Sequence, residues 1–342
     1  MNIFIKNYKL LYYLLIIGMI LFSKTNAQSK AGTTIGQFLK IGPSAKVSSL
    51  ASAGASLSGE ASMAFYNAGS LGRLDKMEFQ FSHVQWLANI DYNYAILAIP
   101  VQGIGNLSLH LTSLNSGEMV VRTVNNPEGT GERFSVTNTS IGLGYSLMLT
   151  DRVSVGFQLN YLTESIWNSS YSNMALSMGV QYQVAENSLQ IGASVANFGP
   201  RAGYSGRDLY IDYDFDPDKY GDNDGLPAEL RTEEYALPTI FRVGMSYPFI
   251  FTDEYAIMVS VDAVHPNDNV ESVNTGIDLK LTNYINIRGG YRGLFLEDSE
   301  GGLVFGAGLN AELMDYGFIF DYAWSDYGRL DKVHRFTISI EF

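Results

Sequence analysis

The sequence has no cysteine, only 9 prolines and few basic residues. Without cysteine, the chain has no disulfide, thiolate metal site or cysteine nucleophile. Few prolines leave long strands uninterrupted. The 22 Lys and Arg residues stand against 35 Asp and Glu, and this net charge of −13 argues against nucleic-acid binding. Beyond residue 27 there is no apolar run of the roughly 18 residues that a membrane helix needs, so any membrane residence is expected to be by barrel.

The first 27 residues predict a cleaved signal peptide. Lys6 and Lys9 form a positive start, Leu10 to Phe22 form a short apolar core, and Thr25-Asn26-Ala27 is a small-residue cleavage site. An uncleaved anchor helix is the alternative, but the apolar core is too short to span a bilayer comfortably.

Alternation of apolar and polar residues recurs from Met77 onward and predicts fourteen strands. The sequence is rich in Tyr (22), Phe (19) and Gly (34), which suits a barrel with aromatic girdles. An even number of strands, most of them about ten residues long, is typical of bacterial outer-membrane barrels. The predicted strands are 77–87, 90–100, 105–114, 135–149, 152–167, 171–183, 188–198, 239–248, 254–264, 271–281, 283–293, 300–312, 315–326 and 333–342.

The placement of charge separates a membrane barrel from a water-soluble sheet. Charged residues avoid the apolar register of their strands, as lipid on that face requires. In 316–324, for example, Asp321 lies on the parity opposite to the aromatic residues; in 283–293, Ile287 is assigned to lipid and Arg288 to the lumen. A soluble β-sandwich or barrel, the alternative, would expose charge on its outer face. The sequence therefore predicts an all-β, fourteen-stranded antiparallel transmembrane barrel in the outer membrane.

The last strand predicts an assembly signal for the barrel-assembly machinery. Phe336, Ile338, Ile340 and Phe342 share one parity and form an apolar face toward outer-membrane lipid. A C-terminal Phe on such a strand is typical of outer-membrane barrels.

The connections predict which end of the barrel faces outside. They alternate between long and short, and long loops of outer-membrane barrels are extracellular. The longest, 199–238, is strongly acidic. Four of its acids are weak candidates for calcium ligands because they alternate in position and precede a Gly: Asp216, Asp218, Asp222 and Asp224. The terminal Glu of an EF-hand is not at the required spacing, so a solvated acidic surface is favoured over a calcium site.

Residues 28–76 differ from the barrel (77–342) in kind. They are rich in Gly, Ala and Ser and show no sustained alternation. Apolar residues such as Phe38, Leu50 and Phe65 favour a hatch or plug folded into the lumen over a disordered periplasmic leader.

No catalytic constellation is found, so neither an enzyme nor a cofactor is expected. The four histidines are scattered, and the sequence has no nucleophile elbow, phosphate loop or zinc-protease motif. The inward charges are nearly balanced, which favours ion pairs that brace the wall or hold the plug over an ion pathway. These charges are Arg242, Lys280, Arg288, Arg292 and Arg335 with Glu164, Asp262, Asp278, Glu312, Asp321 and Glu341.

Several motifs resemble those of PorV/PorQ-like outer-membrane proteins. They include Pro127-Glu-Gly-Thr-Gly131, Asn197-Phe-Gly-Pro200, His265-Pro-Asn-Asp-Asn269 and Arg288-Gly-Gly-Tyr-Arg292. This family is similar in fold to the long-chain fatty acid transporters, which are fourteen-stranded barrels with an N-terminal hatch. The sequence departs from the family in the hatch, where Val47-Ser-Ser-Leu50 and Tyr66-Asn-Ala-Gly69 replace the usual glycine-rich turn and Trp-Asn-Pro-Ala-Gly motif.

The resemblance implies a non-enzymatic accessory or shuttle barrel of type IX secretion, whose loops bind exported cargo or a secretion translocon. The alternative is uptake of a hydrophobic small molecule through a hatch-gated barrel. Apolar residues assigned to the inward face are then expected to line its path or, equally, to pack the hatch; they include Leu97, Ile99, Val304 and Ile319.

Overall fold

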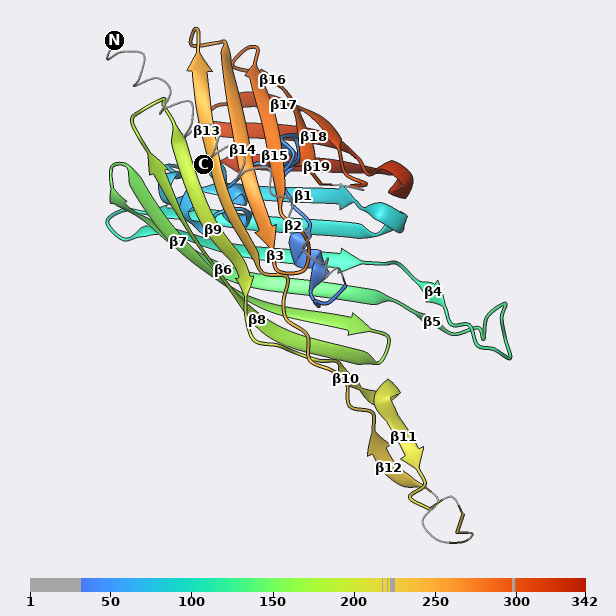
Figure 1. Ribbon diagram of the computed structural model, residues 1–342. Helices are drawn as coiled ribbons and strands as arrows, with labels where there is room; N and C mark the ends of the chain where they lie inside the picture. Colours follow the sequence, from blue (N-terminus) through green and yellow to red (C-terminus); the bar gives the residue numbers. More distant parts are fainter. Residues whose placement is uncertain (1–31, 217, 220, 222–224, 297–298) are drawn as a thin grey trace, which may run out of the picture.

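The computed structural model describes residues 32–216, 218, 219, 221, 225–296 and 299–342. The predicted signal peptide, residues 1–27, lies outside this range. In the described residues, fourteen long strands form a closed antiparallel barrel, in which β1 pairs with β19 and β9 pairs with both β8 and β13 (Figure 1). The strands are β1 (Glu78–Gln85), β2 (Asp91–Val101), β3 (Gly105–Asn115), β6 (Val136–Thr150), β7 (Val153–Ile166), β8 (Ser169–Gln183), β9 (Gln190–Phe198), β13 (Ile240–Ile250), β14 (Ala256–Pro266), β15 (Ser272–Lys280), β16 (Ile285–Leu294), β17 (Leu303–Leu313), β18 (Tyr316–Asp326) and β19 (Lys332–Glu341).

The predicted fourteen-stranded outer-membrane barrel is confirmed. Its strands alternate between an apolar outer face and a polar inner face: Phe157 and Leu159 are about half exposed, whereas Gln158 between them is 3% exposed. This is the arrangement that lipid outside and a polar lumen impose. The protein therefore resides in the outer membrane. No helix among the described residues is long and apolar enough to cross a bilayer.

The face assigned to β2 from the sequence is wrong. Leu97 and Ile99 point outward, while Tyr92, Tyr94 and Ile96 are buried inside the barrel. The inner face of β2 packs against a buried apolar cluster instead of water, so both faces of this strand are apolar and parity gives no signal. For the other two residues of this set the assignment holds: Val304 of β17 is buried, and Ile319 of β18 has the inward parity of Asp321.

The long connections all lie at one end of the barrel, together with the tight turn between β7 and β8, and the other end has short turns. The end with long connections is called the outer end here, because such loops are extracellular in outer-membrane barrels. Its two longest connections carry the small strands β4 (Met119–Val120) and β5 (Arg133–Phe134), and β10 (Ser205–Gly206), β11 (Tyr210–Tyr213) and β12 (Leu226–Glu229). The β11–β12 hairpin projects far from the barrel (Figure 1). Short helices close two further connections, η4 (Leu87–Asn89) and η6 (Gly328–Leu330), and η5 (Arg207–Leu209) precedes β11.

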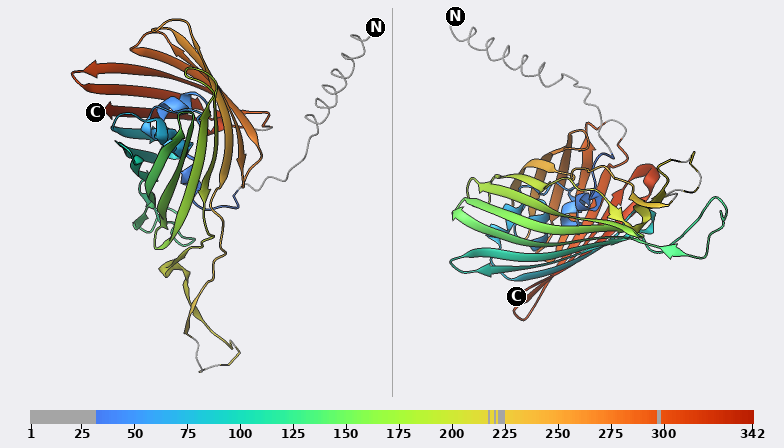
Figure 2. Two further views of the ribbon diagram at one scale, coloured as in Figure 1. Left: turned by 90° about the vertical axis from the view of Figure 1, so that its left-hand side faces the viewer. Right: turned by 90° about the horizontal axis from the view of Figure 1, so that it is seen from below.

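Residues 34–74, called the plug here, lie inside the barrel (Figure 2). The plug contains η1 (Gln37–Lys40), α2 (Ala45–Ser49), η2 (Ala61–Phe65) and η3 (Ala68–Arg73). Its backbone approaches glycines of the wall so closely that a Cβ at Gly156 would meet the carbonyl oxygen of Ala68. Small residues on both sides of the contact allow this packing, which explains the composition of the segment.

Candidate functional site

The outer end of the plug is held by one buried carboxylate of an external connection. Oδ2 of Asp268 accepts hydrogen bonds from Thr34 Oγ1 (2.7 Å), Gln37 Nε2 (2.9 Å) and Lys40 Nζ (2.9 Å). Burial alone would raise the pKa of Asp268, but these hydrogen bonds and the Lys40 charge outweigh burial and lower it. The ionised carboxylate is thus the acceptor that joins three plug residues to the barrel.

Two other elements hold the same end of the plug. Glu164 of β7 accepts the Gly36 amide (2.9 Å) and also bonds Asn138 and the Tyr171 hydroxyl. The Ile35 amide donates to the carbonyl of Ala236 at 3.1 Å, next to an isolated parallel bridge between Thr34 and Ala236. The plug therefore begins against the outer rim and continues through the lumen toward β1.

Deeper in the barrel, inward polar side chains bind the plug backbone. Asp262 Oδ2 accepts the Ala55 amide (2.8 Å), and Arg335 Nε donates to the Gly42 carbonyl (3.2 Å). Further hydrogen bonds of this kind join Glu78 to Ala61, Gln80 to Ser62, Thr337 to Ala45 and Gln181 to Leu57. The plug has little regular structure of its own, so the wall satisfies the backbone groups that would otherwise be buried without partners.

The expected ion pairs form around one arginine. Arg288 Nε lies 3.0 Å from Asp278 Oδ2, and its Nη1 lies 2.5 Å from Asp321 Oδ1. The Arg288 side chain is 2% exposed, so water contributes little to its solvation. Within the plug, Lys46 pairs with Glu60 at 2.5 Å. The near balance of inward acids and bases is thus explained in part by ion pairs between buried side chains.

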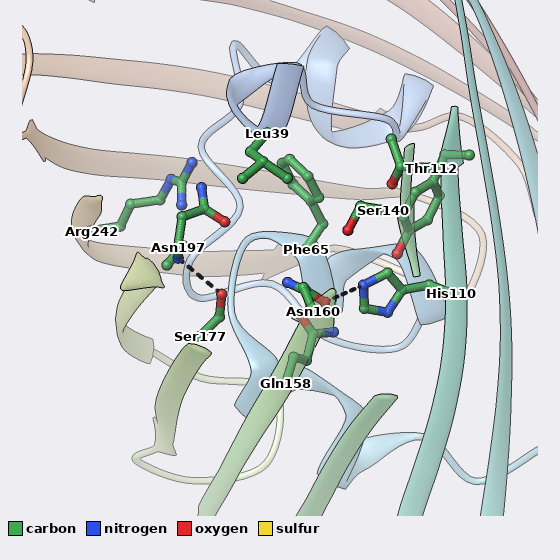
Figure 3. Close-up of a pocket in the computed structure, with 12 residues that line it drawn as sticks. Leu39, Phe65, His110, Thr112, Ser140, Gln158, Asn160, Ser177, Asn197 and Arg242 are labelled. Carbon is green, nitrogen blue, oxygen red and sulfur yellow. Dashed lines mark hydrogen bonds between the residues drawn. The ribbon is translucent and has the colours of Figure 1, made fainter. Parts of the chain in front are cut away.

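A small cavity of about 20 Å³ lies between the plug and the wall of β2, β3, β6, β7, β8, β9 and β13 (Figure 3). Leu39 and Phe65 of the plug border it on one side, and His110 and Asn160 on another, with Nε2 of the histidine 2.8 Å from Oδ1 of the asparagine. Its volume suits about one water molecule. It is too small to hold an organic ligand.

A larger cavity of about 240 Å³, called the outer cavity here, lies at the outer end against β13 to β16. Its floor is the plug, which contributes Lys40, Gly42, Ser52, Phe65 and Tyr66. External connections border it through Asn269, Val270, Leu296 and Ser299, and the wall supplies both apolar and polar side chains, including Ile240, Val264, Arg242, Asn274 and Arg292. A concave site with apolar walls and a few polar groups is the usual form of a small-molecule site.

The acidic connection gives no metal site in the part of the chain that the structure describes. No group of three or more His, Asp or Glu side chains there is arranged to hold a metal ion. Asp216 Oδ2 lies 3.9 Å from Lys219 Nζ, and within the described residues Asp218 forms no ion pair; Asp222 and Asp224 lie outside the described residues. Calcium binding by this loop stays a prediction.

The C-terminal strand occupies the expected place. Phe336, Ile338 and Ile340 lie on the outer face of β19, alternating with buried Arg335, Thr337 and Ser339, and Phe342 follows directly after the strand. The Phe342 amide donates to the Met77 carbonyl at 2.9 Å, and its ring meets that of Tyr316 edge to face. The last residue thus helps to join the two ends of the barrel.

Sequence reasoning missed Asp268 as the residue that holds the plug. The residue stands in the motif His265-Pro-Asn-Asp-Asn269, but nothing in its spacing shows that a segment more than two hundred residues earlier supplies its partners. It also included Arg242 among balanced charges, although this arginine forms no ion pair in the described residues.

No protein-family model and no curated protein matches this sequence. Several solved structures share its fold. The Ralstonia pickettii toluene transporter TbuX is 11% identical, with a TM-score of 0.54 over 88% of this chain and 97% of that chain. The Pseudomonas putida toluene transporter TodX is 10% identical (TM-score 0.53; 84% and 94%), and a Pseudomonas aeruginosa FadL homologue is 12% identical (TM-score 0.52; 85% and 95%). The fold is that of FadL-type outer-membrane barrels.

The predicted role in type IX secretion is wrong. The similar structures are named as toluene transporters and a FadL homologue, which agrees with the alternative of hydrophobic-molecule uptake instead. The resemblance to PorV/PorQ-like proteins rested on short motifs and finds no matching family model. Proteins that share a fold can differ in function, so short shared motifs do not identify the molecule that is carried.

Proposed function

We propose that the protein takes up small hydrophobic molecules across the outer membrane, with the outer cavity as the entry site and the plug as the gate. The observation that carries this proposal is the position of the cavity: it lies at the outer end, and the plug forms its floor. The fold of TbuX and TodX, which are named as toluene transporters, supports the same class of activity.

Passage requires the plug to move, because the plug is packed tightly against the wall below the outer cavity. Its outer end is held by hydrogen bonds to Asp268, Glu164 and Ala236. Each such bond contributes a net stabilisation of about 0.5–1.5 kcal/mol, or more where a charge takes part, so local release costs far less than unfolding of the barrel. A molecule that enters the outer cavity contacts the outer end of the plug, which these hydrogen bonds hold.

A disulfide that locks the outer end of the plug tests the proposal. Thr34 and Ala236 form a bridge, and the chain has no native cysteine, so the double variant Thr34→Cys/Ala236→Cys contains one defined pair. We expect cells that carry the oxidised variant to accumulate radiolabelled toluene several-fold more slowly than reduced cells.

The matched control is Ala202→Cys/Tyr235→Cys, which joins an antiparallel bridge within the same external connection and so places no crosslink between the plug and the barrel. It is expected to leave uptake unchanged in both redox states. Equal uptake by the oxidised and reduced Thr34–Ala236 variant would contradict the proposal.

The partners of the protein follow from its outer surface. We propose that the outward residues of β19 contact outer-membrane lipid and form the strand that the barrel-assembly machinery recognises. The exposed apolar face of this strand and the closing contact of Phe342 with Met77 support this assignment.

A further inference from the structure

The longest external connection carries a hairpin that stands apart from the barrel. Its strands, β11 and β12, form a separate two-stranded sheet in the part of the chain that the structure describes, and they project beyond the barrel in the views of Figures 1 and 2. This hairpin is called the ribbon here. A two-stranded hairpin alone is at best marginally stable in water, so the ribbon lacks the third strand that would stabilise it.

The two faces of the ribbon differ in polarity. One face is apolar and consists of two cross-strand pairs, Ile211 with Ala228 and Tyr213 with Leu226. The three large side chains of this face are exposed, and Phe215, just beyond β11, is 78% exposed. The opposite face carries the other residues of the two strands, Tyr210, Asp212, Pro227 and Glu229. Large apolar side chains gathered on one projecting surface are typical of an interaction site.

The two edges of the ribbon are not equivalent. The Leu230 amide donates to the Leu209 carbonyl at 2.8 Å, so these residues form a hydrogen-bonded pair that continues the ladder. In an antiparallel pair every second residue turns its backbone groups toward the partner strand, which leaves Pro227 among the residues that point away from β11. Because proline has no N–H, it blunts that edge. The free edge of β11 has no proline and offers the backbone groups of Tyr210 and Asp212.

The connection around the ribbon is strongly acidic. From Asp208 to Glu234 the sequence has ten Asp and Glu residues against two basic ones, Lys219 and Arg231. Asp212 lies on the polar face of the ribbon, in the strand with the free edge. Repulsion between like charges disfavours pairing with a second copy of this connection, whereas a segment rich in Lys or Arg is attracted.

We propose that the β11 edge of the ribbon binds an extended segment of another extracellular protein, in which apolar residues alternate with Lys or Arg. Added as a third strand, such a segment places its apolar side chains beside Ile211 and Tyr213 and its basic side chains beside Asp212. It thus completes a three-stranded sheet and complements the charge of the connection. The inference goes beyond the proposed uptake and does not rest on it, because none of the described residues that line the outer cavity belongs to the ribbon.

Calorimetric titration of the purified protein in phosphatidylcholine nanodiscs, with empty nanodiscs as the blank, tests the proposal. The probes are three octapeptides that alternate Val with Lys, Ser with Lys, and Val with Glu. We expect the Val-Lys peptide to bind at least about tenfold more tightly than either of the others, because only this peptide matches both the apolar face and the acids. Its binding is expected to slow hydrogen exchange in β11 more than in β12, since the new backbone hydrogen bonds form at the β11 edge.

Matched variants assign the binding to the ribbon. Tyr213→Ser shortens the apolar face and is expected to weaken binding of the Val-Lys peptide several-fold, whereas Tyr235→Ser, at an exposed tyrosine of the same connection outside the ribbon, is expected to leave it unchanged. Asp212→Asn is likewise expected to weaken binding more than Glu234→Gln, which changes the net charge equally. Heat-modifiable migration on gels shows that each barrel is folded, and Asp212→Asn, which keeps the apolar face, decides the test if Tyr213→Ser disrupts the hairpin.

The variant Tyr213→Cys tests the competing occupant, a second copy of this chain, because the protein has no native cysteine. We expect no disulfide-linked dimer on intact cells under oxidising conditions; such a dimer would show that ribbons pair with each other and would overturn the proposal. Equal binding of the Ser-Lys and Val-Lys peptides, or equal losses in the ribbon variants and their controls, would show only unspecific attraction of positive charge and would overturn it as well.

Discussion

Ile287 and Arg288 are neighbours on β16, yet one faces lipid and the other a dry interior. Ile287 is 47% exposed on the outer face, whereas Arg288 is buried between Asp278 and Asp321. The sequence is sufficient to assign these faces. It does not show whether water fills the lumen, because that depends on how closely the plug packs against this strand.

Because the lumen around Arg288 excludes water, we can predict which of two substitutions, at Ile287 or at Arg288, destabilises the barrel more. Ile287→Arg places a charge toward lipid, at a cost of about 2–4 kcal/mol near the midplane. Arg288→Ile leaves two carboxylates without their buried partner, and breaking such a pair costs about 3–5 kcal/mol. We expect Arg288→Ile to be at least as destabilising in denaturant titrations of vesicle-embedded protein. A much smaller cost would show that water reaches these carboxylates; adding Asp321→Asn to Arg288→Ile should recover part of the loss.

Asp268 gives the plug contact a defined pH dependence. Its lowered pKa means that the contact stabilises the plug above the ordinary carboxyl pKa of about 4 and is lost only as pH falls through the lowered value. We expect the amide protection of residues 32–40, measured by hydrogen exchange and corrected for intrinsic rates, to be equal at pH 7 and pH 5.

The variant Asp268→Asn should lose this protection several-fold at both pH values, while Asp216→Asn, in the projecting loop, should not. Protection in the wild-type protein that declines between pH 7 and pH 5 would be inconsistent with a lowered pKa, and so would an Asp268→Asn variant that behaves like the wild type.

Among the elements, the strands and the presence of a plug were predictable, but the short helices within the plug were not. Strands facing lipid and polar groups show a clear period of two, and the largest difference between predicted and observed bounds is at the start of β17, predicted at 300 and found at Leu303. The inward and outward faces of β2 were assigned wrongly because its inner face packs on the plug and is apolar as well. The short helices of the plug have no periodicity to read, since wall residues such as Gln80 and Asp262 determine where its backbone lies.

The contribution of one strand to barrel assembly can be tested at the C-terminus. Deletion of Phe342 removes an amide bonded to Met77 and an outward aromatic ring at the inner rim. We expect degradation or periplasmic accumulation, measured as loss of heat-modifiable barrel from the outer membrane. Phe342→Tyr keeps both contacts and is expected to assemble normally. Wild-type amounts of folded barrel without Phe342 would show that assembly does not depend on this residue.

For the whole molecule, the sequence predicted the barrel and its place in the outer membrane, whereas its main functional prediction, a role in type IX secretion, is wrong. The alternation of residues and the placement of charge show which face of each strand contacts lipid and which faces the lumen. This information is enough to predict the barrel. The proposed uptake rests on the outer cavity, which is lined by residues of the plug, such as Lys40 and Tyr66, and of the wall, such as Arg242 and Arg292. These residues are far apart in the chain, so their meeting leaves no local pattern.

In this structure the plug fills the lumen, and we expect it to close the barrel to ions. Single-channel conductance in planar bilayers measures this closure when the wild-type barrel is compared with a variant that lacks residues Gln28 to Leu71. Both proteins are first selected for heat-modifiable migration, so that only assembled barrels are measured. We predict a large rise in conductance when the segment is absent, because the space it occupies becomes an aqueous path. Equal conductance with and without the segment would contradict the account.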